Sequence, residues 1–202
     1  MRVIFVHGLF LRGYEAVLLA HHLRVEEIRL ERFRYSSRRE SPAKVATRLA
    51  EDLRRAPDTH IIAHSLGGLI TLTALAEVQP DWRGRAVLLG SPLAGSECAR
   101  RVVARRGGNW LLGAARDILC NGLAPMALPL DRVAVIAGTC NHGVGHVLRA
   151  CSPPGDGVVR VAETRLDGVL HLPQVNTTHL GLIFNKHVAD AVMRFIGKCR
   201  HA

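Results

Sequence analysis

The sequence predicts an α/β fold, in which a mostly parallel sheet of about six strands carries helices on both faces. Short apolar runs alternate with helical runs along most of the chain, as in successive βαβ units. The 202 residues are 48% hydrophobic and contain no internal repeat or long linker, which suits one core. We therefore expect residues 1–202 to form a single domain with its site at the carboxyl ends of the strands.

The expected strands are short runs rich in apolar or β-branched residues. In chain order they are residues 2–6, 26–35, 59–63, 86–89, 132–137 and 158–165. The second run alternates only loosely between apolar and polar residues, whereas the third is compact and β-branched.

The expected helices have apolar residues at helical spacing. They cover residues 13–23, 41–55, 69–78 and 185–197. The second begins at Ser41-Pro42, because Ser is a favoured N-cap and Pro fits the first helical position. Pro80 stops the third. Residues 93–130 fit no strand and look like short helices joined by Gly and Pro, so we expect a short helical insert there.

The chain is strongly basic, with 27 Lys and Arg against 17 Asp and Glu and a formal net charge of +10. Its cations occur singly or in small pairs along the sequence, and aromatic residues make up only 4%. Nucleic-acid binding favours a cationic stripe or a row of stacking aromatics, so we expect no nucleic-acid partner. A solvated basic surface is the simpler interpretation, and it allows weak association with an anionic membrane surface.

The sequence also predicts a cytoplasmic protein without a disulfide framework. The first expected strand begins almost at Met1, which leaves no room for an export signal. The longest apolar runs fall well short of the roughly 20 residues that cross a bilayer. The Cys residues are odd in number, widely spaced and free of any C-x-x-C pair, so we expect buried or inert thiols.

Ser65 is the strongest candidate for a catalytic residue. It lies in Ala63-His64-Ser65-Leu66-Gly67, between a β-branched strand and an apolar helix. The pattern G-x-S-x-G at such a junction makes a sharp turn that exposes the serine and needs small residues two positions before and after it. Ala63 replaces the first Gly with one methyl group more, and Gly67 keeps the second. The alternative is a serine that merely caps the helix.

A second motif, His7-Gly8-Leu9-Phe10, ends the first expected strand. Acyl transfer needs backbone N–H groups that point at the negative oxygen of the tetrahedral intermediate. Beside a serine at such a turn, one donor is the next residue and the other lies in a loop after an early strand. We therefore expect the N–H groups of Leu66 and Leu9 to form an oxyanion hole, with Phe10 as the second choice for Leu9.

These motifs, together with Asp and His residues late in the chain, resemble those of the α/β-hydrolase superfamily. The likeness is to small lipases and esterases such as the minimal lipases of bacilli, which are similar in size and also have Ala before the nucleophile. It covers nearly the whole chain and describes residues 93–130 least. It implies a Ser–Asp/Glu–His triad in that order, an oxyanion hole, a minimal cap, and neither a metal nor an organic cofactor.

The resemblance implies that the triad acid follows the fifth expected strand. Asp156 fits, because it lies in a loop directly before the sixth expected strand and has flanking glycines that free the backbone. Asp167 is the alternative, although Leu166-Asp167-Gly168 looks like a turn. Asp131 precedes its strand and Asp190 lies within the last expected helix, so both are poorly placed.

The base should follow the acid on a loop before the final helix. His179, which is followed by an apolar residue and Gly, matches the family's pattern, and His171 is the alternative. His187 falls within a helical pattern, and His201 lies at the end of the chain.

A zinc site is another interpretation of the histidines. His142 and His146 have the i, i+4 spacing of a zinc pair on a helix. Gly143 and Gly145 disfavour a helix there, and no third ligand is evident, so we expect no metal.

The expected substrate pocket is framed by Phe10, His64 and Leu93, together with Leu9 and the part of the insert around Trp110-Leu111-Leu112. An apolar lining suits a fatty or aromatic acyl group, although core packing explains the same residues equally well. The resulting hypothesis is a serine hydrolase that cleaves small-molecule or lipid esters of carboxylic acids. A thioesterase or phospholipase with the same triad, and a non-catalytic binding protein on the same fold, are the alternatives.

Overall fold

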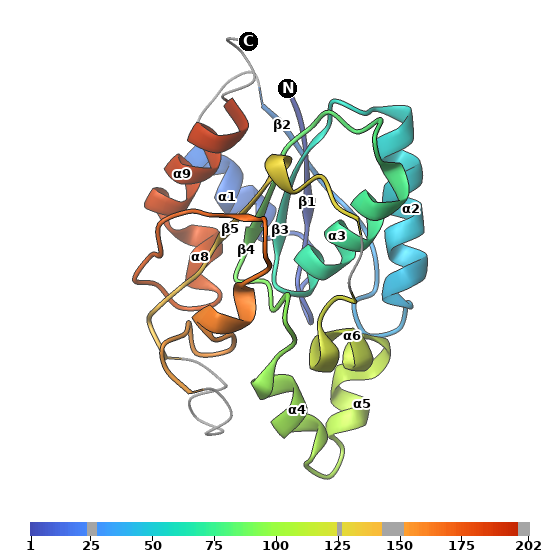
Figure 1. The fold of residues 1–202 in the computed structure, drawn as a ribbon. Coiled ribbons are helices and arrows are strands. Elements are labelled where there is room, and N and C mark those ends of the chain that lie inside the picture. The colour runs from blue at the N-terminus through green and yellow to red at the C-terminus, as the bar shows by residue number, and fades with distance from the viewer. Residues whose placement is uncertain (24–27, 125–126, 143–151, 198–202) are drawn as a thin grey trace.

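A six-stranded, all-parallel sheet runs through the centre of the protein (Figure 1). The structure is a computed structural model that describes residues 1–23, 28–124, 127–142 and 152–197. The strand order is β2-β1-β3-β4-β5-β6. The bounds are β1 Arg2–Val6, β2 Arg29–Arg32, β3 His60–His64, β4 Ala86–Leu89, β5 Val133–Ile136 and β6 Leu170–His171. The predicted fold class is confirmed.

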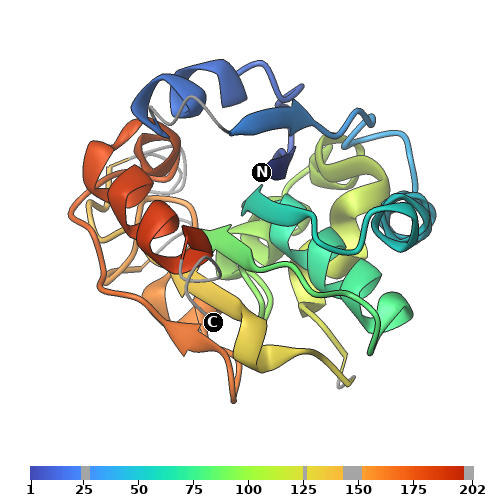
Figure 2. The ribbon, with the colours of Figure 1, turned by 90° about the horizontal axis from the view of Figure 1, so that it is seen from above.

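Helices cover both faces of this sheet, with α1, α8 and α9 on one face and α2 and α3 on the other (Figure 2). Their bounds are α1 Ala16–Leu23, α2 Pro42–Arg55, α3 Leu66–Val78, α8 Gly181–Phe184 and α9 Lys186–Ile196. Successive strand residues point to opposite faces. Ile4 and Val6 therefore belong to the core under α2 and α3, whereas Val3 and Phe5 belong to the core under α1 and α9. No helix in the described ranges combines the length and apolar character needed to cross a membrane.

Between β4 and β5 the chain forms the expected insert of short helices. The insert contains α4 Glu97–Val103, α5 Gly108–Leu112, η1 Gly113–Ala115 and α6 Arg116–Asn121, and the short turn η2 Leu130–Arg132 precedes β5. Figure 1 shows α4, α5 and α6 grouped beyond one end of the sheet, where the strands finish. Ser96 starts α4, because its hydroxyl accepts the N–H of Ala99 at 3.1 Å.

The predicted strand over residues 158–165 is wrong. Val161–Thr164 forms a 3-10 turn, η3, and β6 comes later in the chain. In this segment, backbone N–H groups donate hydrogen bonds to side chains instead of to a neighbouring strand. The Asp156 carboxylate accepts two such hydrogen bonds, at 2.8 and 3.0 Å, and the Glu163 carboxylate accepts a third at 2.9 Å. The other predicted strands and helices occur where expected, with shifted ends.

The strand connections determine where a site can form. From β1 the chain passes to β2 on one side and then to β3 on the other, so the strand order reverses between β1 and β3. In open parallel sheets such a reversal opens a crevice at the carboxyl ends of the strands. The loop with Gly8 follows β1 and Ser65 follows β3, so both sequence motifs meet at this crevice.

Close packing of α3 against β1 fixes this edge of the sheet. A methyl group on Gly67 would lie 2.1 Å from the carbonyl oxygen of Val6 and 2.8 Å from that of His7. Val6 is itself paired with β3 and has little freedom to move. Only glycine therefore allows the first turn of α3 to approach β1 this closely.

Replacing Gly67 by Ala should lower the free energy of unfolding by about 2 kcal/mol or more, because the added methyl group overlaps backbone atoms. Gly197→Ala is the matched control, since a methyl group there meets nothing within 4 Å and the φ of −73° is helical. The control should change the stability by less than about 0.5 kcal/mol. Urea denaturation followed by circular dichroism measures both, and a Gly67→Ala protein as stable as wild type would contradict the close approach.

Candidate active site

Ser65 lies at a sharp turn between β3 and α3. Its φ of 54° and ψ of −121° are values that residues with a side chain rarely adopt, and Phe10 is the one other non-glycine residue in the described ranges with a positive φ. Ser65 occupies the N-cap position of α3, but its side chain makes no capping hydrogen bond. Backbone strain of this kind is typical of functional positions, and the capping interpretation does not explain it.

Small residues around Ser65 make the turn possible. Ala63 is fully buried and pairs with Val6 of β1 and Leu88 of β4, so the sheet accommodates its methyl group. A Cβ atom on Gly68 would lie 2.0 Å from the Oγ atom of Ser91. The replacement of the usual first Gly by Ala therefore leaves the turn intact.

His179, in the loop after β6, and Asp156, in the loop after β5, form a buried pair. The Nδ1 atom of His179 lies 2.7 Å from the Oδ2 atom of Asp156. An ionised carboxylate only accepts hydrogen bonds, so Nδ1 carries the proton and Nε2 keeps a free lone pair. The backbone N–H of His179 also donates to the carbonyl oxygen of Asp156 at 2.9 Å. The structure thus brings together two expected site residues that are well separated in sequence.

The carboxyl group of Asp156 is ionised although it is almost completely buried. Burial alone would raise its pKa. The charge and hydrogen bond of His179 and the N–H groups of Val158 and Val159 outweigh burial, so the pKa of Asp156 lies below its usual value. An ionised carboxylate in this position fixes the tautomer of the imidazole and stabilises its protonated form.

His64, next to Ser65, supports the position of His179. Its Nε2 atom lies 3.0 Å from the backbone carbonyl oxygen of His179, so Nε2 must donate. Burial, together with the charge of His179, lowers the pKa of His64 to about 3, which keeps the ring neutral at neutral pH. Its Nδ1 atom is buried without a partner among the described residues and faces Gly8, where a Cβ atom would lie 2.9 Å away.

Two backbone N–H groups near Ser65 are open to a ligand. Leu66 begins α3 and Leu9 lies in the loop after β1, and neither N–H donates to an acceptor in the described part of the chain. The N–H of Phe10 instead donates to the Oγ atom of Ser37 at 3.2 Å. Leu9 is therefore the better placed of the two residues considered for the second oxyanion donor.

An apolar cavity of about 300 Å³ is lined by both Ser65 and His179. Among the residues expected in the substrate pocket, those that line it are Leu9, Phe10, His64, Leu111 and Leu112. The insert and the loop after β5 supply further lining residues, which include Ala99, Val102, Leu119, Val158 and Val159. The His179 ring forms its hydrogen bond with Asp156, and the bond from a catalytic serine to its base often forms only when a substrate is bound.

Leu93 and Trp110, which the sequence analysis placed in this pocket, lie elsewhere. Leu93 is only 1% exposed and belongs to the core cluster under α3. Its backbone forms hydrogen bonds of 3.0 Å with Ser91 and Leu123. Trp110 is 73% exposed and lines a different cavity.

The alternative acid and base are both at the surface. Asp167 lies in an exposed turn and His171 is exposed on β6, and neither lines the cavity. Of the histidines considered as a zinc pair, His142 lies 3.3 Å from the Sγ atom of Cys140, and His146 lies outside the described residues. Within the described ranges no three His, Cys, Asp or Glu side chains are grouped to hold a metal ion.

The described cysteines are free thiols. Cys98 lines the cavity, and burial raises its pKa to about 11, so it remains protonated. Cys120 and Cys140 are half-buried. Cys151 and Cys199 lie outside the described residues.

Sequence reasoning missed Gly90, which lies against the Asp156–His179 pair. A Cβ atom on Gly90 would be 2.9 Å from the Oδ2 atom of Asp156 and 3.1 Å from the Nδ1 atom of His179, and the φ of Gly90 is +56°. Any side chain there would displace the pair. The available signal was a glycine directly after β4, at the edge of the sheet where sites form.

Comparison with known proteins gives a structural match without a sequence match. Neither a protein-family model nor a curated protein matches the sequence. Among solved structures, the mature form of the lipase BlEst2 from Bacillus licheniformis superposes with a TM-score of 0.80 at 18% identity, over 96% of this chain and 90% of the lipase. The protein has the α/β-hydrolase fold.

Other proteins with the α/β-hydrolase fold also superpose well. The metagenomic carboxyl esterase MGS0156 matches with a TM-score of 0.68 at 18% identity, over 98% of this chain and 76% of the esterase. RedJ, a thioesterase from the prodiginine biosynthetic pathway in Streptomyces coelicolor, matches with a TM-score of 0.66 at 13% identity, over 96% of this chain and 90% of the thioesterase. Identity this low establishes the fold, so the chemistry must be argued from the residues of this chain.

Replacing Asp156 by Asn should remove a contribution to stability that depends on pH. The pKa of Asp156 is lowered in the folded protein, so its ionised form stabilises the fold above about pH 4, and this contribution is lost as the pH falls through the folded-state pKa. The difference in unfolding free energy between wild type and Asp156→Asn should therefore be largest near neutral pH and shrink below about pH 4. Urea denaturation across this range measures it, and a difference that is independent of pH would disprove the ionised pair.

Proposed function

We propose that this protein is a serine hydrolase that cleaves carboxylic esters through an acyl-enzyme, with Ser65 as nucleophile, His179 as base and Asp156 as the acid that orients the base. One observation carries the proposal. Ser65, at a strained turn, and His179, hydrogen-bonded to a buried carboxylate, line the same apolar cavity. A serine and a histidine that only packed against each other would need neither the strain nor the buried charge.

In the proposed reaction, the Nε2 atom of His179 takes the hydroxyl proton as the Oγ atom of Ser65 attacks the acyl carbon. The transfer is needed because a free serine hydroxyl is too weak an acid to ionise near neutral pH. The imidazolium that forms is stabilised by the ionised carboxylate of Asp156. His179 then gives the proton to the leaving oxygen as the carbon–oxygen bond breaks, and the acyl group remains on Ser65.

Water then releases the acyl group by the same steps. His179 takes a proton from water, whose oxygen attacks the acyl carbon, and returns the proton to the Oγ atom of Ser65 as the carboxylic acid leaves. In both tetrahedral intermediates the negative oxygen accepts hydrogen bonds from the backbone N–H groups of Leu9 and Leu66. Both donors belong to backbone held by β1 and α3, so they are oriented before the substrate binds.

The cavity indicates which acyl groups fit. Its volume of about 300 Å³ is at the small end of ligand pockets, and its lining is mainly Leu, Val and Ala. We therefore expect a short or medium-length uncharged acyl group. A thioester passes through the same steps with sulfur as the leaving atom. The lipase, esterase and thioesterase among the structural matches support hydrolysis at an acyl carbon as the reaction class.

Ser65→Ala should lower kcat for p-nitrophenyl butyrate by about four to six orders of magnitude, because the nucleophile is lost. Ser41→Ala is the matched control, since Ser41 is exposed at the start of α2 and its side chain makes no capping hydrogen bond. The control should hydrolyse the ester at the wild-type rate. Initial rates at saturating ester measure both variants.

Covalent labelling separates an enzyme from a binding protein on the same fold. A fluorophosphonate probe should label wild type and Ser41→Ala once, at Ser65, and should leave Ser65→Ala unlabelled. Mass spectrometry of the labelled peptide identifies the site. Hydrolysis by Ser65→Ala at the wild-type rate, or a label on another serine, would overturn the assignment.

A further inference from the structure

A second and larger cavity, of about 940 Å³, adjoins the proposed catalytic pocket. Phe10 and Leu11 line both cavities, so these two residues form a shared wall. The insert contributes to both as well, with Trp110 in the larger cavity and Leu111 in the smaller one. The two cavities are therefore neighbours, and we call the larger one the arginine groove.

The arginine groove is lined by five arginines and by no acidic residue. The arginines are Arg12, Arg32, Arg34, Arg38 and Arg39. Those at positions 12, 34 and 39 are exposed, and their side chains form no ion pair with any residue that the structure describes. Several cations in one concave surface produce a strongly positive potential, which favours an anionic ligand.

Arg38 lies where the groove meets the catalytic pocket. Its Nη2 atom donates to the carbonyl oxygen of Trp110 at 2.8 Å, and its guanidinium lies 4.4 Å from the centroid of the Trp110 ring and 5.7 Å from that of Phe10. Its backbone carbonyl accepts the N–H of Ala114 at 2.9 Å. The Nε atom is buried and has no acceptor in the described ranges. Arg38 is thus held in place while part of its hydrogen-bonding capacity is unused.

Two carboxylates from the same part of the chain have partners other than the groove arginines. Glu40 pairs with Arg48, which lies outside the groove lining, and also accepts the N–H of Ser36. Glu15 accepts the N–H of Gly13 at 3.2 Å. In the described ranges no carboxylate forms an ion pair with an arginine of the groove.

Exposed aromatic rings complete the lining. Tyr14 is 63% exposed and Trp110 is 73% exposed, and both face the groove. The guanidinium of Arg32 lies 3.9 Å from the centroid of the Tyr14 ring. Arginines beside aromatic rings suit a ligand that combines phosphates with an apolar or planar part.

We propose that the arginine groove binds the leaving group of the substrate, and that this leaving group carries phosphate. This inference rests on the proposed function, because it assigns the acyl group to the apolar cavity and the phosphorylated alcohol or thiol to the groove. Guanidinium groups bind phosphate through paired N–H donors, and a cavity of about 940 Å³ has room for a group the size of a nucleotide. Two sources fit this chemistry. One is a thioester of a nucleotide-bearing thiol, and the other is a phospholipid, whose acyl groups are esterified to a phosphorylated glycerol.

Two matched pairs of substrates test the proposal with the wild-type protein. Butyryl-coenzyme A and butyryl-pantetheine share the scissile thioester and differ in the phosphorylated nucleotide. Dioctanoyl phosphatidate and dioctanoylglycerol share the scissile esters and differ in the phosphate. We expect kcat/KM for the phosphorylated member of one pair to exceed that of its partner by at least about tenfold at low ionic strength, and this ratio to fall towards one in about 0.5 M salt.

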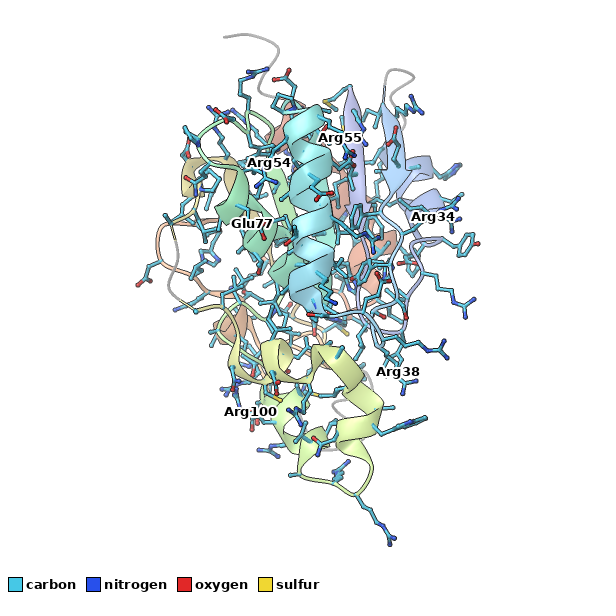
Figure 3. The ribbon with its side chains drawn as sticks, turned by 90° about the vertical axis from the view of Figure 1, so that its right-hand side faces the viewer. Arg34, Arg38, Arg54, Arg55, Glu77 and Arg100 are labelled. Carbon is cyan, nitrogen blue, oxygen red and sulfur yellow. The ribbon has the colours of Figure 1, made fainter. Side chains whose placement is uncertain are left out.

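Variants that remove one arginine charge test whether the preference for phosphorylated substrates arises from the groove. Arg34→Gln and Arg39→Gln should each lower the ratio within the preferred pair by about three- to tenfold, because each removes one guanidinium from the lining. Arg55→Gln is the matched control, since Arg55 is an exposed arginine at the far end of α2 from the groove (Figure 3). Figure 3 shows Arg34 and Arg38 on the same side of the molecule, beside α2. The control should keep the wild-type ratio.

Binding without turnover separates this inference from the proposed function. Titration calorimetry of Ser65→Ala with the preferred phosphorylated substrate should give a Kd that Arg34→Gln, in the same background, raises by about three- to tenfold. Hydrolysis of both members of each pair with equal kcat/KM would overturn the arginine groove and leave the proposed function standing. Binding that depends on Arg34 without any hydrolysis by wild type would overturn the proposed function instead.

Discussion

The position of the whole site depends on how closely α3 approaches β1. Gly67 lies against the carbonyl oxygens at the end of β1, so the chain must turn within one residue between β3 and α3. Ser65 is that residue, and it adopts the strained backbone conformation that the turn requires. The loop after β1 is held just as closely, since a Cβ atom on Gly8 would lie 3.1 Å from the Cβ atom of Ser65. Two glycines therefore place a serine hydroxyl beside the open N–H groups of Leu9 and Leu66.

The Asp156–His179 pair is held in place by hydrogen bonds that offset the cost of burying a charged carboxylate. Burial of a carboxylate is unfavourable by several kcal/mol unless its oxygens are hydrogen-bonded. Here one oxygen of Asp156 accepts two backbone N–H groups and the other accepts the His179 ring. His64 donates a hydrogen bond to the backbone carbonyl of His179, and Gly90 leaves the space that the pair occupies. The imidazole thus has a fixed tautomer and a fixed orientation, and it reaches the site from a loop rather than from a helix or strand.

Most of the fold could be predicted from the sequence, because its signals are local. A β-branched run, a serine between small residues and an apolar helix occur within twenty residues of each other, and this order alone indicated the turn at Ser65. The predicted strand over residues 158–165 is wrong because a short run of apolar and β-branched residues also occurs in a loop. The backbone N–H groups of that loop donate to the side chains of Asp156 and Glu163. The burial of Leu93 depends on how the insert folds back, which no local pattern encodes.

The arginine groove shows how topology changes the meaning of a charge pattern. Along the sequence the arginines are scattered, and this scatter argued against a cationic face. Parallel strands, however, finish at the same edge of a sheet, so loops that are remote in sequence become neighbours there. Because β1 and β2 are paired in parallel, Arg12 after β1 meets Arg34, Arg38 and Arg39 after β2, and the insert closes the other side with Trp110. The arginines therefore lie together because of the strand order. Their groove adjoins the crevice that contains Ser65.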